Sequence, residues 1–270
     1  MLQERGCSMT LELLLSTMNL NLSDLDKMNI TTPCIVINQC GNVGYREYKN
    51  FRIYDTDNIG VGKSRNMAIS KSNADILLFC DNDCVYNDGY YDMIINFYNM
   101  HPKADMVFFN MNIFDNSIKN DNQLKRIYWY NYQRYGMVRI TCKRKSIINN
   151  NIIINEKFGG NSMYSHGEDT IFIHDFLSHK LSLYSSNQSI GTINQNDSTW
   201  FEGYNDKFFF DKGALFRVIS PRFCYLQCLQ YAIRHKKILK NIGFIKSLKL
   251  MNSGINAYNK GLSYGDVYEK

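Results

Sequence analysis

Two aspartates separated by one residue, Asp81 and Asp83, follow a short apolar run at residues 76–79. A short apolar run indicates a buried strand, and acidic residues at its carboxyl end face the crevice where open α/β sheets bind ligands. Two carboxylates so placed hold a hard divalent cation, which in turn holds a diphosphate. An isolated pair of this kind is more often a solvated turn, so the neighbouring segments decide the interpretation.

The segments before the pair predict a βαβ unit. Residues 51–54 are typical of a strand, residues 55–62 form a loop with Gly60 and Gly62, and residues 63–72 have a helical pattern. Strand, glycine loop, helix and strand in this order predict a parallel sheet. Downstream, we expect a helix over residues 90–99 and further strands over residues 104–110 and 138–142.

Two phosphate-binding motifs are excluded by single residues. Gly62-Lys63-Ser64 resembles the end of a P-loop, but Asp57 stands where that motif needs its first glycine. Gly60-Val61-Gly62 begins a dinucleotide fingerprint, but Arg65 occupies the position of the third glycine. Neither a P-loop NTPase nor a dinucleotide-binding enzyme is favoured.

A second acidic pair, Glu168-Asp169, lies between a glycine-containing segment at residues 158–161 and a helical pattern at residues 171–178. Ser165 or His166 is the expected start of that helix. The glycine segment is suited to placing carboxylates over a pocket, near the positive end of the helix dipole. Taken alone, the pair is better explained as an acidic helix cap.

Length and composition favour one α/β domain with a C-terminal extension. We expect one domain over residues 1–211, divided into two halves at residues 9–110 and 111–211, and a basic helical extension over residues 212–270. No apolar run is long enough to span a bilayer, and the N-terminal residues show no signal-peptide pattern. The natural start of the chain is either Met1 or Met9. Eight cysteines without zinc spacing indicate reduced thiols and a cytoplasmic protein.

Charge is unevenly distributed along the chain. From residue 212 to residue 264 there is no Asp or Glu, while ten residues are Lys or Arg. This asymmetry points to an anionic partner. Residues 223–250 combine apolar and basic residues, which is typical either of an amphipathic helix on an anionic leaflet or of a solvated helix packed on the catalytic body.

The ordered set of motifs resembles the family 2 glycosyltransferases with the GT-A fold, of the bacterial surface-polysaccharide type. The resemblance rests on the glycine loop, on Arg65-Asn66, and on Asp81-Asn82-Asp83 after its strand. Two upstream strands, at residues 13–15 and 34–39, and the Glu168-Asp169 pair extend it over roughly two thirds of the chain. One departure is Asn38-Gln39, where family members usually carry an acidic residue that binds the base.

The resemblance implies a GT-A fold, with a Rossmann-like, mixed, mainly parallel sheet flanked by helices. It implies that residues 1–211 are the catalytic domain, with a nucleotide-sugar-binding half at residues 9–110 and an acceptor half at residues 111–211. It implies an inverting, metal-dependent transfer of a sugar from a nucleotide diphosphate, favouring UDP, to a hydroxyl acceptor. Asp169 would be the general base and Glu168 would orient the acceptor, while Mn²⁺ or Mg²⁺ would be held by Asp83 and Asp81. The nucleotide-sugar site would comprise Ser16, Thr17, Asn38, Gln39, Gly60, Arg65, Asp81 and Asn82.

Several assignments stay open at this point. We expect Arg65 either to contact a phosphate of the donor or to anchor Asp81 by a charge-assisted hydrogen bond. We expect Trp200 either to stack on the acceptor sugar or to belong to the apolar core. The acceptor is a saccharide or a lipid-linked saccharide, with possible peripheral contact at the inner face of the plasma membrane. The main alternative function is a catalytically inactive nucleotide-sugar- or carbohydrate-binding protein. Nucleic acid is not expected as a partner.

Overall fold

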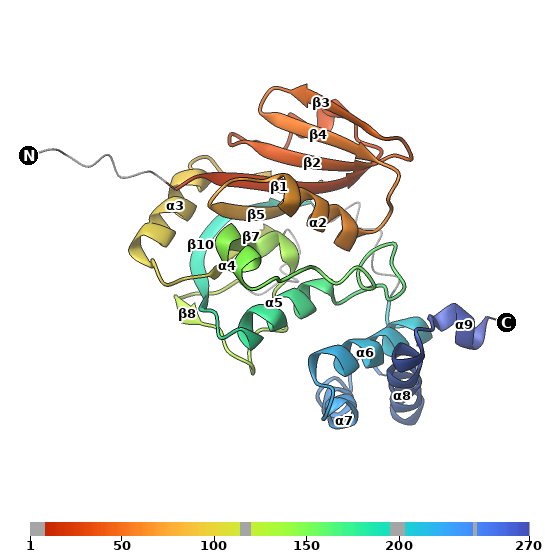
Figure 1. Ribbon diagram of the computed structural model, residues 1–270. Helices are drawn as coiled ribbons and strands as arrows, with labels where there is room; N and C mark the ends of the chain where they lie inside the picture. The colour runs from red at the N-terminus through yellow and green to blue at the C-terminus, as the bar shows by residue number, and fades with distance from the viewer. Residues whose placement is uncertain (1–8, 114–119, 195–202, 240–241, 270) are drawn as a thin grey trace, which may run out of the picture. The chain divides into compact units, whose positions relative to one another are not determined.

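The computed structural model describes residues 9–113, 120–194, 203–239 and 242–269 (Figure 1). These residues form two compact units. Within the described ranges, the first unit takes residues 9–59, 63–153 and 175–194, and the second takes residues 60–62, 154–174 and 203–269. Two helices, α2 (Val61–Lys71) and α5 (Glu168–Ser178), contribute residues to both units.

The first unit is built on a ten-stranded mixed sheet with the order β3-β4-β2-β1-β5-β9-β7-β10-β6, in which β8 also pairs with β10. Figure 1 shows β4, β2, β1 and β5 side by side, and their pairing is parallel throughout. The strands are β1 (Leu11–Met18), β2 (Cys34–Gln39), β3 (Gly44–Tyr48), β4 (Phe51–Thr56), β5 (Ile76–Asp81), β6 (Cys84–Tyr86), β7 (Met106–Ile113), β8 (Lys125–Arg126), β9 (Ile140–Lys143) and β10 (Leu183–Ile193).

The central strands are buried on both faces, which explains their continuous apolar sequences. All six residues of β2 are buried, as are the first five of β1 and the first five of β5. Parallel strands covered on both sides read as unbroken runs of Val, Ile and Leu instead of alternating patterns. Helix α3 (Tyr90–Met100) adds Ile94 and Tyr98 to the same core. The strands expected at residues 13–15, 34–39, 51–54 and 76–79 are confirmed.

The remainder of the first unit departs from the sequence predictions in places. The strand expected over residues 138–142 begins instead as a 3-10 turn, η1 (Met137–Arg139), and only then becomes β9. The side chain of Arg139 is buried there, and hydrogen bonds satisfy its guanidinium group. Its Nε donates to the Phe109 carbonyl at 2.8 Å, and its Nη2 donates to Oδ1 of Asn110. Short helices α1 (Leu22–Leu25) and α4 (Arg144–Asn149) follow β1 and β9.

The second unit contains the C-terminal helices α6 (Asp206–Ile219), α7 (Cys224–Arg234), α8 (Phe244–Lys260) and α9 (Tyr264–Tyr268). Helices α6 and α8 approach so closely that Gly213 faces the Met251 carbonyl and Gly254 faces the Phe210 carbonyl, and a Cβ on either glycine would overlap backbone. This close packing places Phe209, Phe210 and Met251 in an apolar core separate from that of the sheet.

The amphipathic segment at residues 223–250 is not a single helix. It is divided into α7 and the start of α8, and Gly243, with a φ of 85°, immediately precedes α8. Such a φ suits glycine and interrupts a continuous helix. The two cysteines of α7, Cys224 and Cys228, are buried as small core residues.

The fold class is confirmed: a mixed, mostly parallel sheet is flanked by helices. Among the described residues, no helix is both long and apolar enough to cross a membrane. The seven cysteines in the described ranges are all free thiols.

Candidate active site

In the first unit, the carboxyl ends of four parallel strands bring the predicted donor-site residues to one edge of the sheet. The register sets Ser16 of β1 opposite Asp81 of β5, and Thr17 opposite Asn38 of β2. Asn38 in turn stands opposite Asp55 of β4. Because parallel strands end in the same direction, residues that are 65 positions apart in the chain become neighbours at this edge.

Asp81 is the last residue of β5 and is held by an arginine. The Nη2 of Arg65 donates to Oδ1 of Asp81 at 2.9 Å. Arg65 is only 4% exposed, whereas the side chain of Asp81 is 37% exposed. A charge-assisted hydrogen bond from a buried guanidinium fixes the carboxylate while leaving it accessible to a ligand. Of the two arrangements expected for Arg65, the contact with Asp81 is therefore present.

Asp83 lies in the short turn between β5 and β6, two residues beyond Asp81, with the exposed Asn82 between them. The backbone carbonyl of Asp83 accepts the N–H of Asn194 at 2.8 Å, which ties the turn to the residue after β10. The turn is thus fixed at both ends by the sheet. Both carboxylates of the Asp-Asn-Asp motif lie on this fixed turn and its supporting strand.

The hydroxyl of Ser16 joins β1 to helix α2. Its Oγ donates to Oγ of Ser64 at 2.6 Å, and Ser64 is buried. The sequence marks Ser64 only as part of a P-loop motif, which Asp57 excludes. The only available signal was its spacing from Arg65, since both residues lie in the first turns of the helix that follows the glycine loop.

Asn38 is committed to the protein's own hydrogen bonds. Its Oδ1 accepts the N–H of Leu20 at 2.9 Å, and its Nδ2 donates to Oδ1 of Asp55 at 2.6 Å. The other oxygen of Asp55 pairs with Arg46 of the edge strand β3. An acidic residue therefore stands beside the end of β2, one strand away from the position where the sequence lacks it. Sequence reasoning had assigned Asp55 to the glycine loop.

In the second unit, Glu168 and Asp169 are the first two residues of α5, which starts later than the predicted Ser165 or His166. Oδ1 of Asp169 accepts the N–H of Thr170 at 2.6 Å. The carboxyl group of Glu168 lies against Gly159, where a Cβ would come within 2.9 Å of its Cδ and 2.5 Å of Val61 Cγ1. Gly159 also has a φ of 99°, so the space for Glu168 depends on glycine at this position.

The glycine loop before α2 packs on the same segment. The N–H of Val61 donates to the carbonyl of Gly160 at 3.2 Å, and Gly62 fits closely against the backbone of Asn155 and Glu156. Within the second unit, Gly60, Val61 and Gly62 are thus brought beside the segment that precedes the acidic pair. The sequence predicted both glycine segments but gave no indication that they contact each other.

Two basic side chains lie near Asp169: Lys212, which the sequence does not single out, and His166, which the sequence indicates only as a candidate helix start. Burial lowers the pKa of Lys212 to about 8, against the opposing attraction of Asp169 and Asp211. Its ammonium group lies 5.3 Å from the ring centre of Phe208 and 5.6 Å from that of Tyr231. Burial, reinforced by Lys212, also holds the pKa of His166 well below its usual value. Nothing in the spacing of the basic region distinguished Lys212 from its neighbours.

The chain matches the sequence profile of glycosyl transferase family 2 over residues 39–165. This range contains the glycine loop, Arg65 and the Asp-Asn-Asp motif. The match covers just under half of the chain. The protein is a nucleotide-sugar glycosyltransferase, as its motifs predicted.

Solved structures agree with this assignment in their fold. Residues 1–349 of Staphylococcus aureus TarS in complex with UDP-GlcNAc align with a TM-score of 0.59 at 13% identity, covering 95% of this chain and 93% of that one. The UDP complex of the same fragment gives 0.52 at 12% identity with the same coverage. A longer TarS chain gives 0.56 at 13% identity, covering 93% of this chain and 55% of its own length. No curated protein sequence matches.

The Asp-Asn-Asp motif offers two carboxylates as oxygen ligands for a divalent cation. Among the described residues, no group of three or more His, Cys, Asp or Glu side chains is arranged to hold a metal. Mg²⁺ and similar hard cations are commonly bound by one or two carboxylates together with substrate phosphates and water. Asp81 and Asp83 fit a cation of that kind and do not form a complete protein cage.

Two further features complete the description of this glycosyltransferase. Trp200, the predicted acceptor residue, lies outside the described residues.

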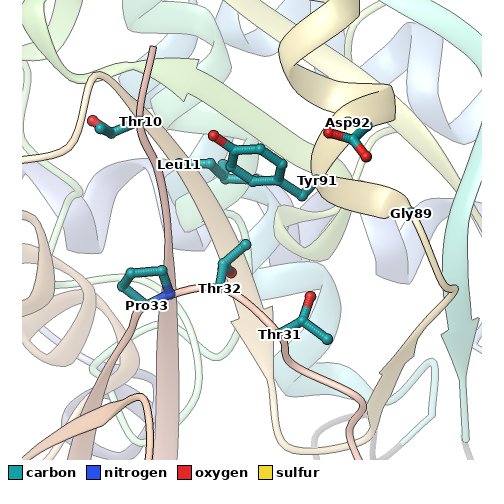
Figure 2. Close-up of a pocket in the computed structure, with 8 residues that line it drawn as sticks. All are labelled: Thr10, Leu11, Thr31, Thr32, Pro33, Gly89, Tyr91 and Asp92. Carbon is teal, nitrogen blue, oxygen red and sulfur yellow. The ribbon is translucent and has the colours of Figure 1, made fainter. Parts of the chain in front are cut away.

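A groove of about 560 Å³ opens at the amino ends of the central strands, opposite to the edge that carries Asp81. Thr10, Pro33 and Tyr91 line this groove (Figure 2). Thr10 and Pro33 precede β1 and β2, so this groove is separate from the carboxyl edge that carries Asp81.

Proposed function

We propose that this glycosyltransferase moves one sugar from a UDP-sugar to a hydroxyl group of a glycan acceptor, with inversion at the anomeric carbon. The observation that carries the proposal is the alignment of Ser16, Asn38 and Asp81 at the carboxyl ends of adjacent parallel strands. This edge is where open α/β sheets bind nucleotides. The UDP-GlcNAc and UDP complexes of TarS, which shares the fold, support UDP as the nucleotide.

The donor would lie along this edge. Thr17, Gln39, Gly60 and Asn82 complete the proposed wall for the nucleoside and diphosphate, with Ser16 set in place by Ser64. Asn38 takes a positioning role, because its amide already holds Asp55 and the Leu20 backbone. Asp55, beside the end of β2, would then contribute the negative charge that this strand lacks.

Asp83 and Asp81 would hold Mn²⁺ or Mg²⁺ together with the diphosphate. When bound, such a cation neutralises the charge that develops on the departing diphosphate. The buried guanidinium of Arg65 fixes Asp81 in one orientation, so the carboxylate does not need to reorganise when the donor binds. Arg65 is therefore a positioning residue in this proposal.

Asp169 would act as the general base. The acceptor oxygen forms a bond to the anomeric carbon as the bond from that carbon to the diphosphate oxygen breaks, and the diphosphate leaves with the electron pair. The acceptor proton passes to a carboxylate oxygen of Asp169, which makes the alcohol a better nucleophile as the transition state forms. A single displacement of this kind inverts the configuration. Glu168, fixed against Gly159, would orient the acceptor.

The proposed acceptor is a saccharide or a lipid-linked saccharide used in building a cell-envelope polysaccharide. A lipid-linked acceptor would require the enzyme to work near a membrane, and the basic C-terminal region suits peripheral contact with anionic lipid. Trp200 remains a proposed acceptor contact.

The proposal is tested by incubating the purified enzyme with a panel of UDP-sugars, beginning with UDP-GlcNAc, and with soluble saccharide acceptors. We expect release of UDP with one donor and a product whose anomeric configuration, measured by NMR, is opposite to that of the donor. A product with retained configuration would contradict the single displacement. Binding of UDP-sugars without any turnover across the panel would favour a binding protein instead.

A further inference from the structure

Helix α7 has two apolar faces, of which only one is covered. Cys224, Cys228 and Ala232, spaced four residues apart, are buried in the core of the second unit. Tyr225, Leu229 and Ile233 follow each of these by one residue and are exposed, and Leu226 is exposed beside them. Residues four apart lie on one side of a helix, so these four side chains form a continuous exposed surface, which we call the α7 face.

The exposure of the α7 face is large for apolar side chains. Leu226 is 62% exposed and Ile233 is 50% exposed. The surface continues into the first turn of α8, where Ile245 is 70% exposed. A groove of about 380 Å³, lined by Ile233, Lys236, Leu239 and Phe244, connects the two helices. Contiguous apolar surface of this kind marks a binding surface in a soluble unit.

The charged residues that border the α7 face along the sequence are all basic. Arg222 precedes the helix, Arg234 ends it, and Lys236 and Lys237 follow it, all exposed. The sequence from residue 213 to residue 264 contains no carboxylate side chain. An apolar face bordered by Lys and Arg is complementary to a surface that is apolar inside and negative outside, which describes a leaflet containing anionic lipid.

Self-association through this face is disfavoured by the same charges. In a two-fold symmetric contact the same patch meets itself, so the basic residues that border one copy would face those of the other. Like charges brought together across an interface oppose binding. The arrangement therefore selects an anionic lipid surface over a second copy of the chain.

We propose that the α7 face and the first turn of α8 bind the surface of an anionic membrane, with the leucine and isoleucine side chains entering the interface and the basic residues meeting lipid phosphates. This proposal rests on the proposed function only in identifying the setting, a lipid-linked acceptor. It assigns the membrane contact to α7 and the first turn of α8, and none of the residues proposed for catalysis takes part in that contact.

The test is binding of the full chain to vesicles of phosphatidylcholine alone and of phosphatidylcholine mixed with phosphatidylglycerol. We expect the wild-type protein to bind the anionic vesicles at least about tenfold more tightly than the neutral ones, since several basic residues contribute. We expect the double variant Leu226→Glu/Ile233→Glu to lose at least about tenfold of this binding. Replacing Lys236 and Lys237 with Gln should weaken binding while leaving the apolar face intact.

A matched control is Ile148→Glu/Ile153→Glu, which changes two exposed isoleucines of the first unit in the same way. It should bind anionic vesicles nearly as the wild type does. UDP release with a soluble acceptor should be unchanged in the α7-face variant, so a loss of membrane binding is distinguished from a loss of catalysis. Equal binding by the α7-face variant and the wild type would overturn the proposal. So would a wild-type protein that ignores anionic vesicles or dimerises through this face.

Discussion

Arg65 and Asp81 form an ion pair whose basic member is buried in the first unit and whose acidic member is accessible at the end of β5. The guanidinium is held by α2 and the carboxylate by the sheet, so the pair fixes the helix and the strand to each other at the donor edge. Removing Arg65 would leave the carboxylate without its partner and free to rotate. In the proposed donor site, Arg65 therefore acts by positioning Asp81 and does not need to contact the sugar.

Replacing Arg65 with Met should lower kcat/KM by about tenfold or more, because Asp81 loses its charge-assisted hydrogen bond. The free energy of unfolding should fall by about 1–3 kcal/mol. Steady-state UDP release and urea unfolding measure the two effects. Arg46→Met, which removes the more exposed partner of Asp55, is the comparison variant. Unchanged kinetics in Arg65→Met would show that Asp81 does not depend on this pair.

Replacing Gly159 with Ala should destabilise the second unit by more than about 1 kcal/mol, because its φ is positive and a Cβ would meet Val61 and Glu168. Gly41→Ala is the matched control, since Gly41 also has a positive φ but has open space around it. Thermal unfolding compares them. Adding Glu168→Ala to Gly159→Ala should recover part of the difference. Equal losses in the two glycine variants would mean that backbone strain alone, without the clash, sets the cost.

Replacing Asn38 with Ala should reduce the free energy of unfolding by about 1–3 kcal/mol, because the Leu20 N–H and Asp55 each lose a partner. Affinity for UDP should fall only to the extent that the Asp55 carboxylate moves when it loses the hydrogen bond from Asn38. Urea unfolding and calorimetric titration with UDP separate the two effects, and Asn58→Ala serves as an exposed control. Loss of UDP binding with unchanged stability would assign Asn38 to direct recognition of the base.

Stability should depend on pH through Lys212. Burial lowers the pKa of its ammonium group to about 8, from 10.5 in an unperturbed lysine. Between these values the unfolded chain holds a proton that the folded chain has released, so the free energy of unfolding rises with pH across this window. Below about pH 8 both states are protonated and this contribution is constant.

The variant Lys212→Met should lack this rise. Urea unfolding between pH 7.5 and 10.5 measures the free energy of unfolding of the variant and of the wild type. The contributions of other titrating groups cancel in the difference between the two. Lys103→Met, at an exposed lysine of the first unit, should retain the wild-type profile. Parallel curves for Lys212→Met and the wild type would place the titration elsewhere.

Transfer should require a divalent cation. Chelation should abolish UDP release, and added Mn²⁺ or Mg²⁺ should restore it. In Asp83→Asn the half-activating cation concentration should rise by about tenfold or more, since a neutral amide is a weaker ligand for a hard cation. Asp92→Asn, at an exposed helix position by the groove of Figure 2, is the control. Full activity in the presence of chelator would contradict the role proposed for the Asp-Asn-Asp motif.

The sequence predicted the elements whose patterns are local. Buried parallel strands such as β2 and β5 read directly from their apolar runs, and the motif residues at their ends followed. Strand β10 was missed because its centre, Ser185-Ser186-Asn187-Gln188-Ser189, is polar and its pairing with β7 is irregular. Asp55 was assigned to a loop because its place beside Asn38 depends on strand register, which no local pattern carries.

The same limit applies to the second unit. The contact of the glycine loop with Gly160 joins segments about a hundred residues apart, and nothing in either segment specifies the other. The aromatic surroundings of Lys212 come from α6 and α7, which are separate helices. Chemistry that depends on neighbours in sequence was predictable here, whereas chemistry that depends on packing required the structure.

The central claim, that Asp169 accepts the proton of the acceptor, is tested most directly by Asp169→Asn. The amide keeps the size of the side chain but is a far weaker base, so we predict that transfer, and slow hydrolysis of the UDP-sugar by water, both fall by about 10²-fold or more. UDP affinity, measured by calorimetry on the same preparation, should stay within about twofold, because Asp169 is not part of the proposed donor wall. Transfer at the wild-type rate by a correctly folded Asp169→Asn variant would contradict the account.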